Sequence, residues 1–237
     1  MNSINADTLL VLDKISSDDF FLKDSAKLIG GTALAYHFNH RESFDVDISF
    51  PYCSKLPSFD FLLKYNAEKI EFDIGTIQTI ENDGGDIDHY QQRFYIDNIK
   101  TDFMVNLGSN FIEADILKND KGKKFNNIEI ASPETIFKQK SLLLMDRNKI
   151  RDLYDVVFFL KNTDKVAKEI LDTIKEYRIT YRDKDIISFI KAKKQDIMDI
   201  SQEPISRPIN GMSTSYNVLK NYLVKELEKT QNLEIGR

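Results

Sequence analysis

The sequence has one cysteine, three histidines and no long apolar run, and each shortage excludes a class of protein. Cys53 has no second cysteine to pair with, which excludes an intrachain disulfide and favours a reducing compartment. His37, His40 and His89 lack the spacing of a zinc finger. The apolar runs are short and broken by charges, so no membrane span is predicted. Since the first residues do not resemble a signal peptide, we expect a cytoplasmic protein.

The size and charge of the chain are those of an ordinary water-soluble protein. Its 237 residues suffice for one large domain or two small ones. A net charge of −5 argues against nucleic-acid binding over the whole surface but allows a local basic face. Residues 165–195 carry nine Lys or Arg against five Asp or Glu, with Tyr177 and Tyr181 among them. This segment is either a face that guides a nucleic acid or an amphipathic helix with a solvated side.

Hydrophobic periodicity predicts alternating helices and strands in the first half of the chain. Residues 7–24 have helical spacing, with Leu9, Leu10, Leu12 and Ile15 facing inward. Turn residues and periodicity further predict a strand at 27–29, a helix at 32–39 with Thr32 near its N-cap, a strand at 44–50, a helix at 59–66, a strand at 70–74 with a bulge or bend at Gly75, and a hairpin of 91–96 and 99–105 around Asp97-Asn98.

The pattern becomes helical after about residue 131. Ser132, Pro133 and Glu134 supply a cap, a first-turn proline and an acid near the positive end of a helix dipole. Residues 132–160 are interpreted as one helix. We therefore predict an α/β (α+β) fold, with a mixed-sheet domain at residues 1–131 and a mostly helical domain at 132–237.

Two features of the first half point to phosphate and metal chemistry. Gly30 and Gly31 follow the apolar run 26–29 and precede a predicted helix, which lets backbone N–H groups approach a phosphate closely. Asp45 and Asp47 are two positions apart on a predicted strand, so they share the face opposite the core. Carboxylates that close repel unless a cation lies between them. Together these features indicate metal-dependent chemistry on a nucleoside triphosphate (NTP).

Asp102 is the candidate for a third carboxylate. It lies on the polar face of the predicted strand 99–105, and with Asp45 and Asp47 it would hold two Mg²⁺ ions, one for the triphosphate and one for the attacking hydroxyl. A D-x-D pair is also common on solvated strand faces. Asp97 is the rival third acid, but its place beside Asn98 favours a turn.

A row of cations marks the second half. On a single helix over residues 132–160, Lys140, Leu144, Arg147 and Arg151 lie in one narrow arc, opposite the apolar positions. The row is either a solvated face with helical ion pairs or a set of cations that neutralise triphosphate or RNA charge. Asp152 and the nearby Asp155 are placed to orient these cations or to assist a base.

These segments together resemble a known family. Residues 30–34 (GGTAL) and 40–47 (HRESFDVD), followed by Lys140, Arg147 and residues 151–155 (RDLYD), are similar to the AbiEii/AbiGii toxin-type nucleotidyltransferases. The resemblance covers residues 28–160 or so and depends on the combination, since either piece alone is weak. It implies a DNA polymerase β-like nucleotidyltransferase core at residues 1–131, followed by the helical domain.

The resemblance also implies roles for individual residues. In that scheme Gly31 and Thr32, after Gly30, would lie beside the phosphates, and Asp45 and Asp47 would bind metal. Lys140 would contact the nucleotide and Asp152 would be a second acid. Arg41 and Ser43 match the pattern as supports of the site, and Arg147 and Arg151 as cations for the nucleotide. The third acid is often degenerate in the family, so without Asp102 one metal rather than two is expected.

The sequence thus predicts an enzyme that moves a nucleoside monophosphate (NMP) from an NTP, with Mg²⁺ or Mn²⁺, to an acceptor. The favoured acceptor is an RNA 3′ end, above all of tRNA, in a toxin role with an antitoxin partner. A protein hydroxyl and a small molecule remain open as acceptors. Two other functions also stay open: a non-catalytic nucleotide- or partner-binding module of the same fold, and kinase-like phosphoryl transfer from ATP.

Overall fold

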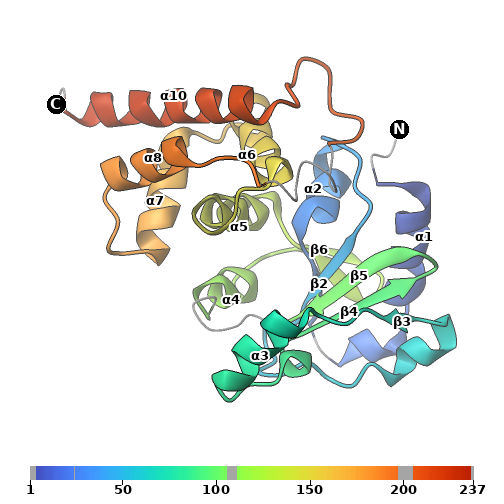
Figure 1. Cartoon of the computed structure of the whole chain (residues 1–237). Helices are drawn as coiled ribbons and strands as arrows, with labels where there is room; N and C mark the ends of the chain where they lie inside the picture. Colours follow the sequence, from blue (N-terminus) through green and yellow to red (C-terminus); the bar gives the residue numbers. More distant parts are fainter. Residues whose placement is uncertain (1–3, 24, 106–110, 197–204, 236–237) are drawn as a thin grey trace. The chain divides into compact units, whose positions relative to one another are not determined.

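The computed structural model describes residues 4–23, 25–105, 111–196 and 205–235 (Figure 1). The chain divides into two compact units. The first contains Met1–Asn39 and Ser43–Ile136, and the second contains His40–Glu42 and Phe137–Arg237. A segment of three residues just before the predicted acidic strand thus belongs with the helical half of the sequence.

The described part of the first unit is built on a seven-stranded mixed sheet with the strand order β3-β4-β5-β2-β1-β7-β6. The pairs β2–β5 and β1–β7 are parallel and the other neighbours are antiparallel. This mixed sheet, followed by helices, confirms the predicted fold class. The strands are β1 (Lys27–Leu28), β2 (Val46–Ser49), β3 (Glu68–Lys69), β4 (Gln91–Ile96), β5 (Ile99–Met104), β6 (Lys123–Phe125) and β7 (Ile128–Ile130).

Helices and short 3₁₀ turns connect these strands. They are α1 (Ala6–Ser16), η1 (Asp19–Leu22), α2 (Gly30–Phe38), η2 (Asp60–Tyr65), α3 (Ile74–Asn82), η3 (Ile87–His89) and α4 (Phe111–Lys118). The helix predicted over residues 7–24 is shorter than expected, because Asp18 accepts a hydrogen bond from Phe20 N and begins η1. Leu10, predicted to face inward, is 67% exposed, whereas Leu12 and Ile15 are buried as expected.

The strand predicted at residues 70–74 is wrong. Regular strand ends at Lys69, and Asp73 instead caps α3 by accepting a hydrogen bond from Thr76 N at 2.9 Å. Gly75 therefore lies in the first turn of a helix and not at a bulge. The alternation of apolar residues in this segment predicted a strand, but the Asp73 side chain favours a helix start instead. It accepts a hydrogen bond from a backbone N–H group that the first turn of a helix would otherwise leave without a partner.

The predicted hairpin is confirmed. Strands β4 and β5 pair in the register Ile96↔Ile99, with Asp97 and Asn98 between them. Both turn residues have positive φ, 49° and 62°, as a two-residue type I′ turn requires. Asn and Asp tolerate this conformation better than most residues.

Aromatic side chains fill the core of the first unit around the centre of the sheet. Phe103 of β5 and Phe50, just after β2, are buried, and Phe59 stacks on Phe103 with 4.4 Å between ring centroids. Val46 and Ile48 of β2 are also fully buried, so the expected inward face of this strand is confirmed from Val46 on. Phe44 lies before the strand and is 40% exposed.

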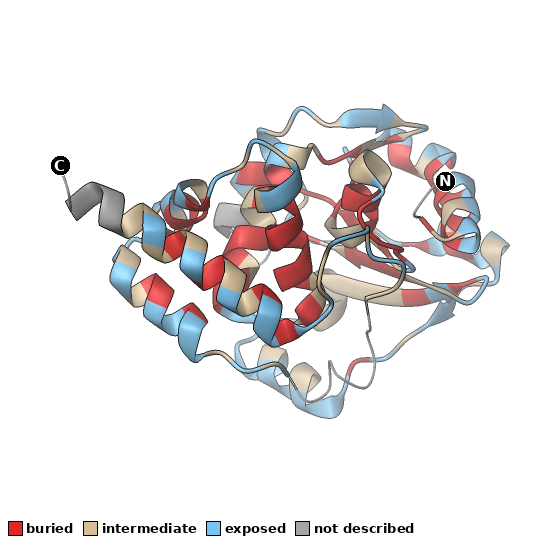
Figure 2. Cartoon of the chain, turned by 90° about the horizontal axis from the view of Figure 1, so that it is seen from above, coloured by how far each residue is buried: buried red, intermediate tan, exposed pale blue. Residues whose placement is uncertain are grey.

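The described part of the second unit is helical. Its helices are α5 (Pro133–Asp146), whose first turn belongs to the first unit, α6 (Ile150–Asn162), α7 (Ala167–Tyr177), α8 (Asp183–Ala192) and α10 (Tyr216–Ile235). Helix α10 packs against α6, α7 and α8, and Figure 2 shows the buried faces of these helices. No helix in the described ranges is both long and apolar enough to cross a bilayer.

The start of α5 is confirmed, because Thr135 N donates to Ser132 Oγ at 3.3 Å. The single helix predicted over residues 132–160 is wrong, since α5 ends at Asp146 and α6 begins at Ile150. The break changes the helical phase between Lys140 and Arg151.

Candidate active site

The glycine turn is the first turn of α2, and its geometry requires glycine. Gly30 has φ +71°, which side-chain-bearing residues rarely adopt. A Cβ added there would lie 2.5 Å from Asp47 Oδ2. The carboxylate of Asp47 therefore lies directly against the glycine turn. Ile29 N donates to Asp47 O at 2.9 Å, which holds the strand beside the turn.

Thr32 connects the glycine turn to the segment before β2. It is the third residue of α2 and not its N-cap, because Ile29 is the N-cap and contributes no side-chain hydrogen bond. The Thr32 hydroxyl donates to the Asp45 carbonyl, and its oxygen lies 2.8 Å from Ser43 Oγ. Since Thr32 and Ser43 are both buried, they position the backbone at Asp45.

The register of the sheet brings Asp47 and Asp102 together. They are direct partners in the parallel pair β2–β5, so their side chains share one face of the sheet. Asp45 precedes β2, and Asp45 and Asp47 are both half-buried, whereas Asp102 is only 6% exposed. Asp102 Oδ1 is buried and has no hydrogen-bond partner in the described part of the protein.

Two cations lie against Asp102. Lys100 Nζ donates to Asp102 Oδ2 at 3.0 Å, and Arg93 Nε lies 3.7 Å from the same oxygen. Burial opposes the charge on Lys100, but Asp102, Asp47 and Asp45 outweigh it and raise the pKa of the Lys100 ammonium. Lys100 therefore partly neutralises this acidic group of residues.

Asp45 and Asp47 are the residues of this acidic group that could hold a cation. Half-buried carboxylates such as Asp45 and Asp47 are the hard oxygen ligands that Mg²⁺ takes. Among the described residues, no group of three or more His, Cys, Asp or Glu is arranged to hold a metal ion. Because Asp102 Oδ2 is already bound by Lys100, it does not complete a three-carboxylate set in this structure.

The second unit contains a buried ion network centred on Asp155 of α6. Arg41 donates from Nε at 2.8 Å and from Nη2 at 3.1 Å to the two Asp155 oxygens. His40 Nε2 lies 2.8 Å from Oδ1, and Lys140 Nζ of α5 lies 2.8 Å from Oδ2. Arg41 is 3% exposed at its side chain and Asp155 is fully buried. A paired, desolvated guanidinium–carboxylate contact of this kind is rigid.

Asp152 extends the network toward the surface. It binds Lys140 Nζ at 2.6 Å and Arg147 Nε at 2.6 Å. Burial opposes ionisation of Asp152, but Lys140 and Arg147 outweigh it and lower the pKa to about 2. The pKa of Asp155 is likewise held well below its usual value, by Arg41 and Lys140 against the effect of burial. Both carboxylates are therefore ionised at neutral pH.

The network fastens the segment His40–Glu42. Tyr154 donates from its hydroxyl to His40 O at 3.0 Å. Glu42 N donates to Ser206 O at 2.9 Å, and Glu42 Oε2 accepts from Ser206 Oγ at 2.9 Å. Burial lowers the pKa of His40 despite its contact with Asp155, so its ring is neutral at neutral pH. This segment ends immediately before Ser43 and three residues before Asp45 in the sequence.

One protein family matches most of the chain. A family model described as nucleotidyl transferase AbiEii toxin, type IV toxin–antitoxin system, matches residues 15–216. The chain belongs to this family. The comparison with curated proteins gives no match.

The AbiEii match includes every residue predicted for the site. The structure places them in two groups. The first unit contains Gly30, Gly31, Thr32, Ser43, Asp45, Asp47 and Asp102, and the second contains Arg41, Lys140, Arg147, Arg151 and Asp152.

One prediction for this AbiEii chain is wrong in part, namely that the row of cations lies on one helix face away from the core. Lys140 is 5% exposed and Leu144 is 6% exposed, so neither faces solvent, whereas Arg147 is exposed. The interruption of the helix at residues 147–149 is the cause, because it removes the common phase on which the stripe depended. The interpretation that Asp152 and Asp155 orient these cations agrees with their contacts.

Sequence reasoning missed the cations that surround Asp102. Lys100 lies two residues before Asp102 on the same face of β5, a spacing that is visible in the sequence. Arg93 becomes a neighbour only through the register Arg93↔Asp102 of the hairpin. Tyr154, which anchors His40 O, gives no signal beyond its place within residues 151–155.

Proposed function

We propose that the protein transfers an NMP from an NTP to the 3′ end of an RNA, with tRNA as the preferred acceptor, and acts as the toxin of a toxin–antitoxin pair. Membership of the AbiEii nucleotidyl transferase family supports the reaction class and the antitoxin partner. The single observation that carries the proposal is the carboxylate of Asp47 lying against the glycine turn at Gly30. A polyphosphate binds backbone N–H groups of such a turn, and a carboxylate beside it is placed to share a cation with that polyphosphate.

The acidic residues have separate roles in this proposal. Asp45 and Asp47 would hold one Mg²⁺ or Mn²⁺, which when bound neutralises phosphate charge and polarises the bond to be broken. Gly30 and Gly31 would bind phosphate oxygens through the start of α2. Thr32 and Ser43 position the backbone of Asp45. Asp102 Oδ1, which has no hydrogen-bond partner among the described residues, is assigned to accept the proton of the acceptor hydroxyl.

The proposed reaction balances without a further reactant. The oxygen of the RNA 3′ hydroxyl forms a bond to the α-phosphorus, and the bond from that phosphorus to the oxygen of the β-phosphate breaks. Pyrophosphate leaves with the electron pair. The hydroxyl proton passes to Asp102 and then to solvent.

Incubation with radiolabelled nucleotides tests the proposal. Total RNA is mixed with the protein, a divalent cation and each of the four NTPs labelled at the α-phosphate, and a parallel series carries the label at the γ-phosphate. We expect α-label in RNA, release of pyrophosphate, and no product with Asp45→Ala or Asp47→Ala. Transfer of the γ-label indicates phosphoryl transfer instead. Absence of product with every base contradicts the proposal.

A second candidate is a nucleotide-binding module without turnover. The contacts of Lys100 and Arg93 with Asp102 favour it, because they occupy an oxygen that a two-metal site would use. Calorimetry with NTP and Mg²⁺ separates the two functions. The module binds the nucleotide without releasing pyrophosphate, whereas the enzyme releases it once RNA is added.

A further inference from the structure

The hairpin of β4 and β5 has one face in the core and one face beside the candidate site. The core face contains three buried apolar side chains, Phe94, Ile96 and Phe103. Side chains alternate along a strand, and direct partners on two paired strands share a face. The opposite face, called the hairpin face below, therefore contains Arg93, Tyr95, Lys100 and Asp102.

Tyr95 is an exposed aromatic side chain on the otherwise charged hairpin face. It is 46% exposed, and its side chain makes no hydrogen bond or ring contact with another described residue. Its direct partner is Lys100, and Asp102 is its diagonal neighbour, at about 7–8 Å. A lone exposed aromatic is common on protein surfaces, but this one lies next to the residue assigned to the acceptor hydroxyl. Its ring is open to a ligand that reaches Asp102.

Two buried polar atoms of the hairpin face lack a hydrogen-bond partner in the described ranges. They are Asp102 Oδ1 and Arg93 Nε. Arg93 Nε lies 3.7 Å from Asp102 Oδ2, beyond hydrogen-bond distance, and the guanidinium carbon is 4.2 Å from the centroid of the Phe72 ring. Buried polar atoms are nearly always paired, so an acceptor and a donor left over on neighbouring strands indicate a polar ligand.

The strand order determines the side from which an acceptor reaches the phosphate. Strand β2 lies between β1, which leads into the glycine turn, and β5, which pairs with β4 (Figure 1). In the proposed function the polyphosphate binds at Gly30 and Gly31. The attacking and leaving oxygens lie in line on opposite sides of the α-phosphorus, so the acceptor lies on the side of β5 and β4. The hairpin face is the surface that it meets there.

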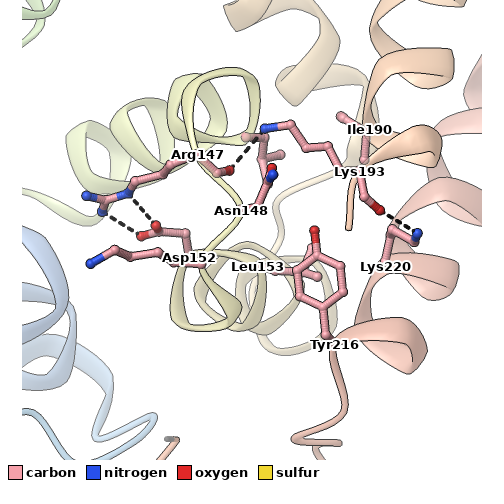
Figure 3. A pocket seen from close by; sticks show the side chains of 10 residues that line it. Arg147, Asn148, Asp152, Leu153, Ile190, Lys193, Tyr216 and Lys220 are labelled. Atoms are coloured by element: carbon pink, nitrogen blue, oxygen red, sulfur yellow. Dashed lines mark hydrogen bonds and ion pairs between the residues drawn. The ribbon is translucent and has the colours of Figure 1, made fainter. Parts of the chain in front are cut away.

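The hollow in the second unit is too small for a nucleotide. It is lined by residues at or next to the ends of α5, α6, α8 and α10 (Figure 3), and it has room for about one water molecule behind a mostly apolar surface. Lys193 Nζ donates to Arg147 O at 3.0 Å, and Lys220 Nζ donates to Lys193 O at 2.8 Å. Both ammonium groups at this hollow are therefore already bound to backbone carbonyls.

We infer that the hairpin face binds the last nucleotide of the RNA acceptor, with its base stacked on Tyr95 and its 3′ hydroxyl at Asp102. The inference rests on the proposed function for the identity of the acceptor. Any nucleobase stacks on an exposed tyrosine, because every base has a π face. The diagonal separation of Tyr95 and Asp102 is comparable with the distance from a base to the 3′ hydroxyl of its own nucleotide. Tyr95 thus positions the hydroxyl and takes no part in proton transfer.

Fluorescence of the base analogue 2-aminopurine tests the stack without requiring turnover. Short single-stranded RNAs carry this base either at the 3′ end or at an internal position, and no NTP is added. Stacking quenches the fluorescence, so saturating protein should quench the terminal probe more strongly than the internal one. For Tyr95→Ala we expect this difference to disappear and the affinity for RNA to fall about ten-fold. Tyr95→Phe keeps the π face and is expected to retain both.

Tyr52→Ala is the matched control. Tyr52 is an exposed tyrosine of the same unit, but it follows β2 at the end opposite to Asp45. Its removal is expected to leave both the quenching and the affinity unchanged. Equal quenching of the terminal probe by the unmodified protein and by Tyr95→Ala overturns the inference, and so does a terminal probe that the unmodified protein does not quench.

Steady-state kinetics separates this inference from the proposed function. With NTP labelled at the α-phosphate, Tyr95→Ala should raise the KM for RNA about ten-fold and leave the KM for NTP unchanged, which a loss of folded protein would not do. Transfer with an unchanged KM for RNA overturns the stack, but the proposed function stands. Quenching that depends on Tyr95, with no transfer by the unmodified protein, supports the hairpin site and contradicts the proposed enzyme.

A cross-link in the unmodified protein covers the case in which Tyr95→Ala fails to fold. RNA with 4-thiouridine as its last nucleotide is irradiated in the presence of the protein. The product is digested with trypsin, which cleaves after Arg93 and Lys100. We expect the RNA on the peptide of residues 94–100, as identified by mass spectrometry. Cross-links confined to other peptides overturn the inference.

Discussion

Two pairs of aspartates, one in each unit, have opposite surroundings. Asp45 immediately precedes β2 and Asp47 lies in it, both half-buried, with Asp47 against the glycine turn. Asp152 and Asp155 lie on α6, almost fully buried, with Arg41, Lys140 and Arg147 bound directly to them. Both pairs lie within residues 15–216, the range that the family model matches.

The comparison distinguishes carboxylates that stabilise the fold from carboxylates to which we assign a role in the reaction. A buried carboxylate that is paired with cations of the protein contributes to a fixed geometry, and removal of one partner leaves an uncompensated charge. In the proposed function, a half-buried carboxylate beside the glycine turn would share a cation with a bound phosphate. We therefore expect substitutions in the first pair to affect activity and those in the second pair to affect stability.

The largest expected effect is on stability, from Asp155→Asn. This change leaves Arg41 buried without its carboxylate, and we expect the free energy of unfolding to fall by about 3–5 kcal/mol. Urea denaturation measures it. The control is Asp146→Asn, an exposed partner of Arg178 that should cost less than about 1 kcal/mol. Equal losses in the two variants would remove the distinction between the pairs.

The counterpart in the first unit is Asp45→Asn or Asp47→Asn. Each change is expected to lower the rate of NMP transfer at least about 100-fold, equivalent to about 2.7 kcal/mol in the transition state. The free energy of unfolding should change by less than about 1 kcal/mol, because both side chains are only half-buried. Label transfer measures the expected loss of rate, and urea denaturation of the same preparations measures the expected small change in stability. A variant that unfolds easily contradicts the comparison.

Acid should destabilise the protein through the buried pair. The folded-state pKa of Asp152 is about 2, below its ordinary 3.8, so the stabilisation is complete above about pH 4 and disappears as the pH falls toward 2. This one carboxylate contributes about 2 kcal/mol. Burial lowers the pKa of His40 from 6.5, so a further loss of folding stability begins as the pH falls below 6.5. Unfolding free energies over a pH series check this, with Asp152→Asn as the control in which the loss of stability at low pH is smaller by about 2 kcal/mol.

The glycine turn provides a smaller and more selective test. Gly30→Ala and Gly84→Ala both place a Cβ at positive φ, +71° and +76°, and each should cost about 1 kcal/mol of stability. Only at Gly30 does the added Cβ meet Asp47 Oδ2, whereas nothing lies within 4 Å of it at Gly84. We therefore expect about ten-fold slower transfer for Gly30→Ala alone. Equal activity of the two variants would mean that the position of Asp47 is unimportant.

The smallest effect is expected at Asp97. This residue lies in the β4–β5 turn with φ 49° and pairs with Lys14 at 2.8 Å on the surface. Asp97→Asn should change the free energy of unfolding by less than about 0.5 kcal/mol and leave transfer unchanged. Asp102→Asn, by contrast, should lower transfer. A loss of transfer for Asp97→Asn alone would restore Asp97 as the third acid.

Local sequence signals predicted much of the sheet-bearing unit. The β4–β5 hairpin could be read from Asp97-Asn98 because only a few residues accept positive φ at both turn positions. The inward face of β2 followed from strict alternation at Val46 and Ile48. Where two local signals competed, as at residues 70–76, the cap from Asp73 replaced the alternating strand, and the sequence did not show which would prevail.

The candidate site was predicted as a set of residues rather than as an arrangement. The proximity of Asp47 to the glycine turn followed from a strand–turn–helix pattern that leaves the two side by side. The neutralisation of Asp102 by Lys100 and Arg93 depends on register, and the burial of Lys140 depends on the break between α5 and α6. Helical-wheel reasoning cannot foresee such a break, because one change of phase moves a residue from the solvated side to the core.

By itself the sequence determined which residues have the chemistry to bind phosphate and cation, and which short elements carry them, because backbone preference and periodicity act over a few residues. The tertiary structure alone decided which aspartates became buried and paired and which stayed half-buried. That outcome depends on contacts between residues more than 100 positions apart, such as Arg41 with Asp155, and no local pattern encodes them.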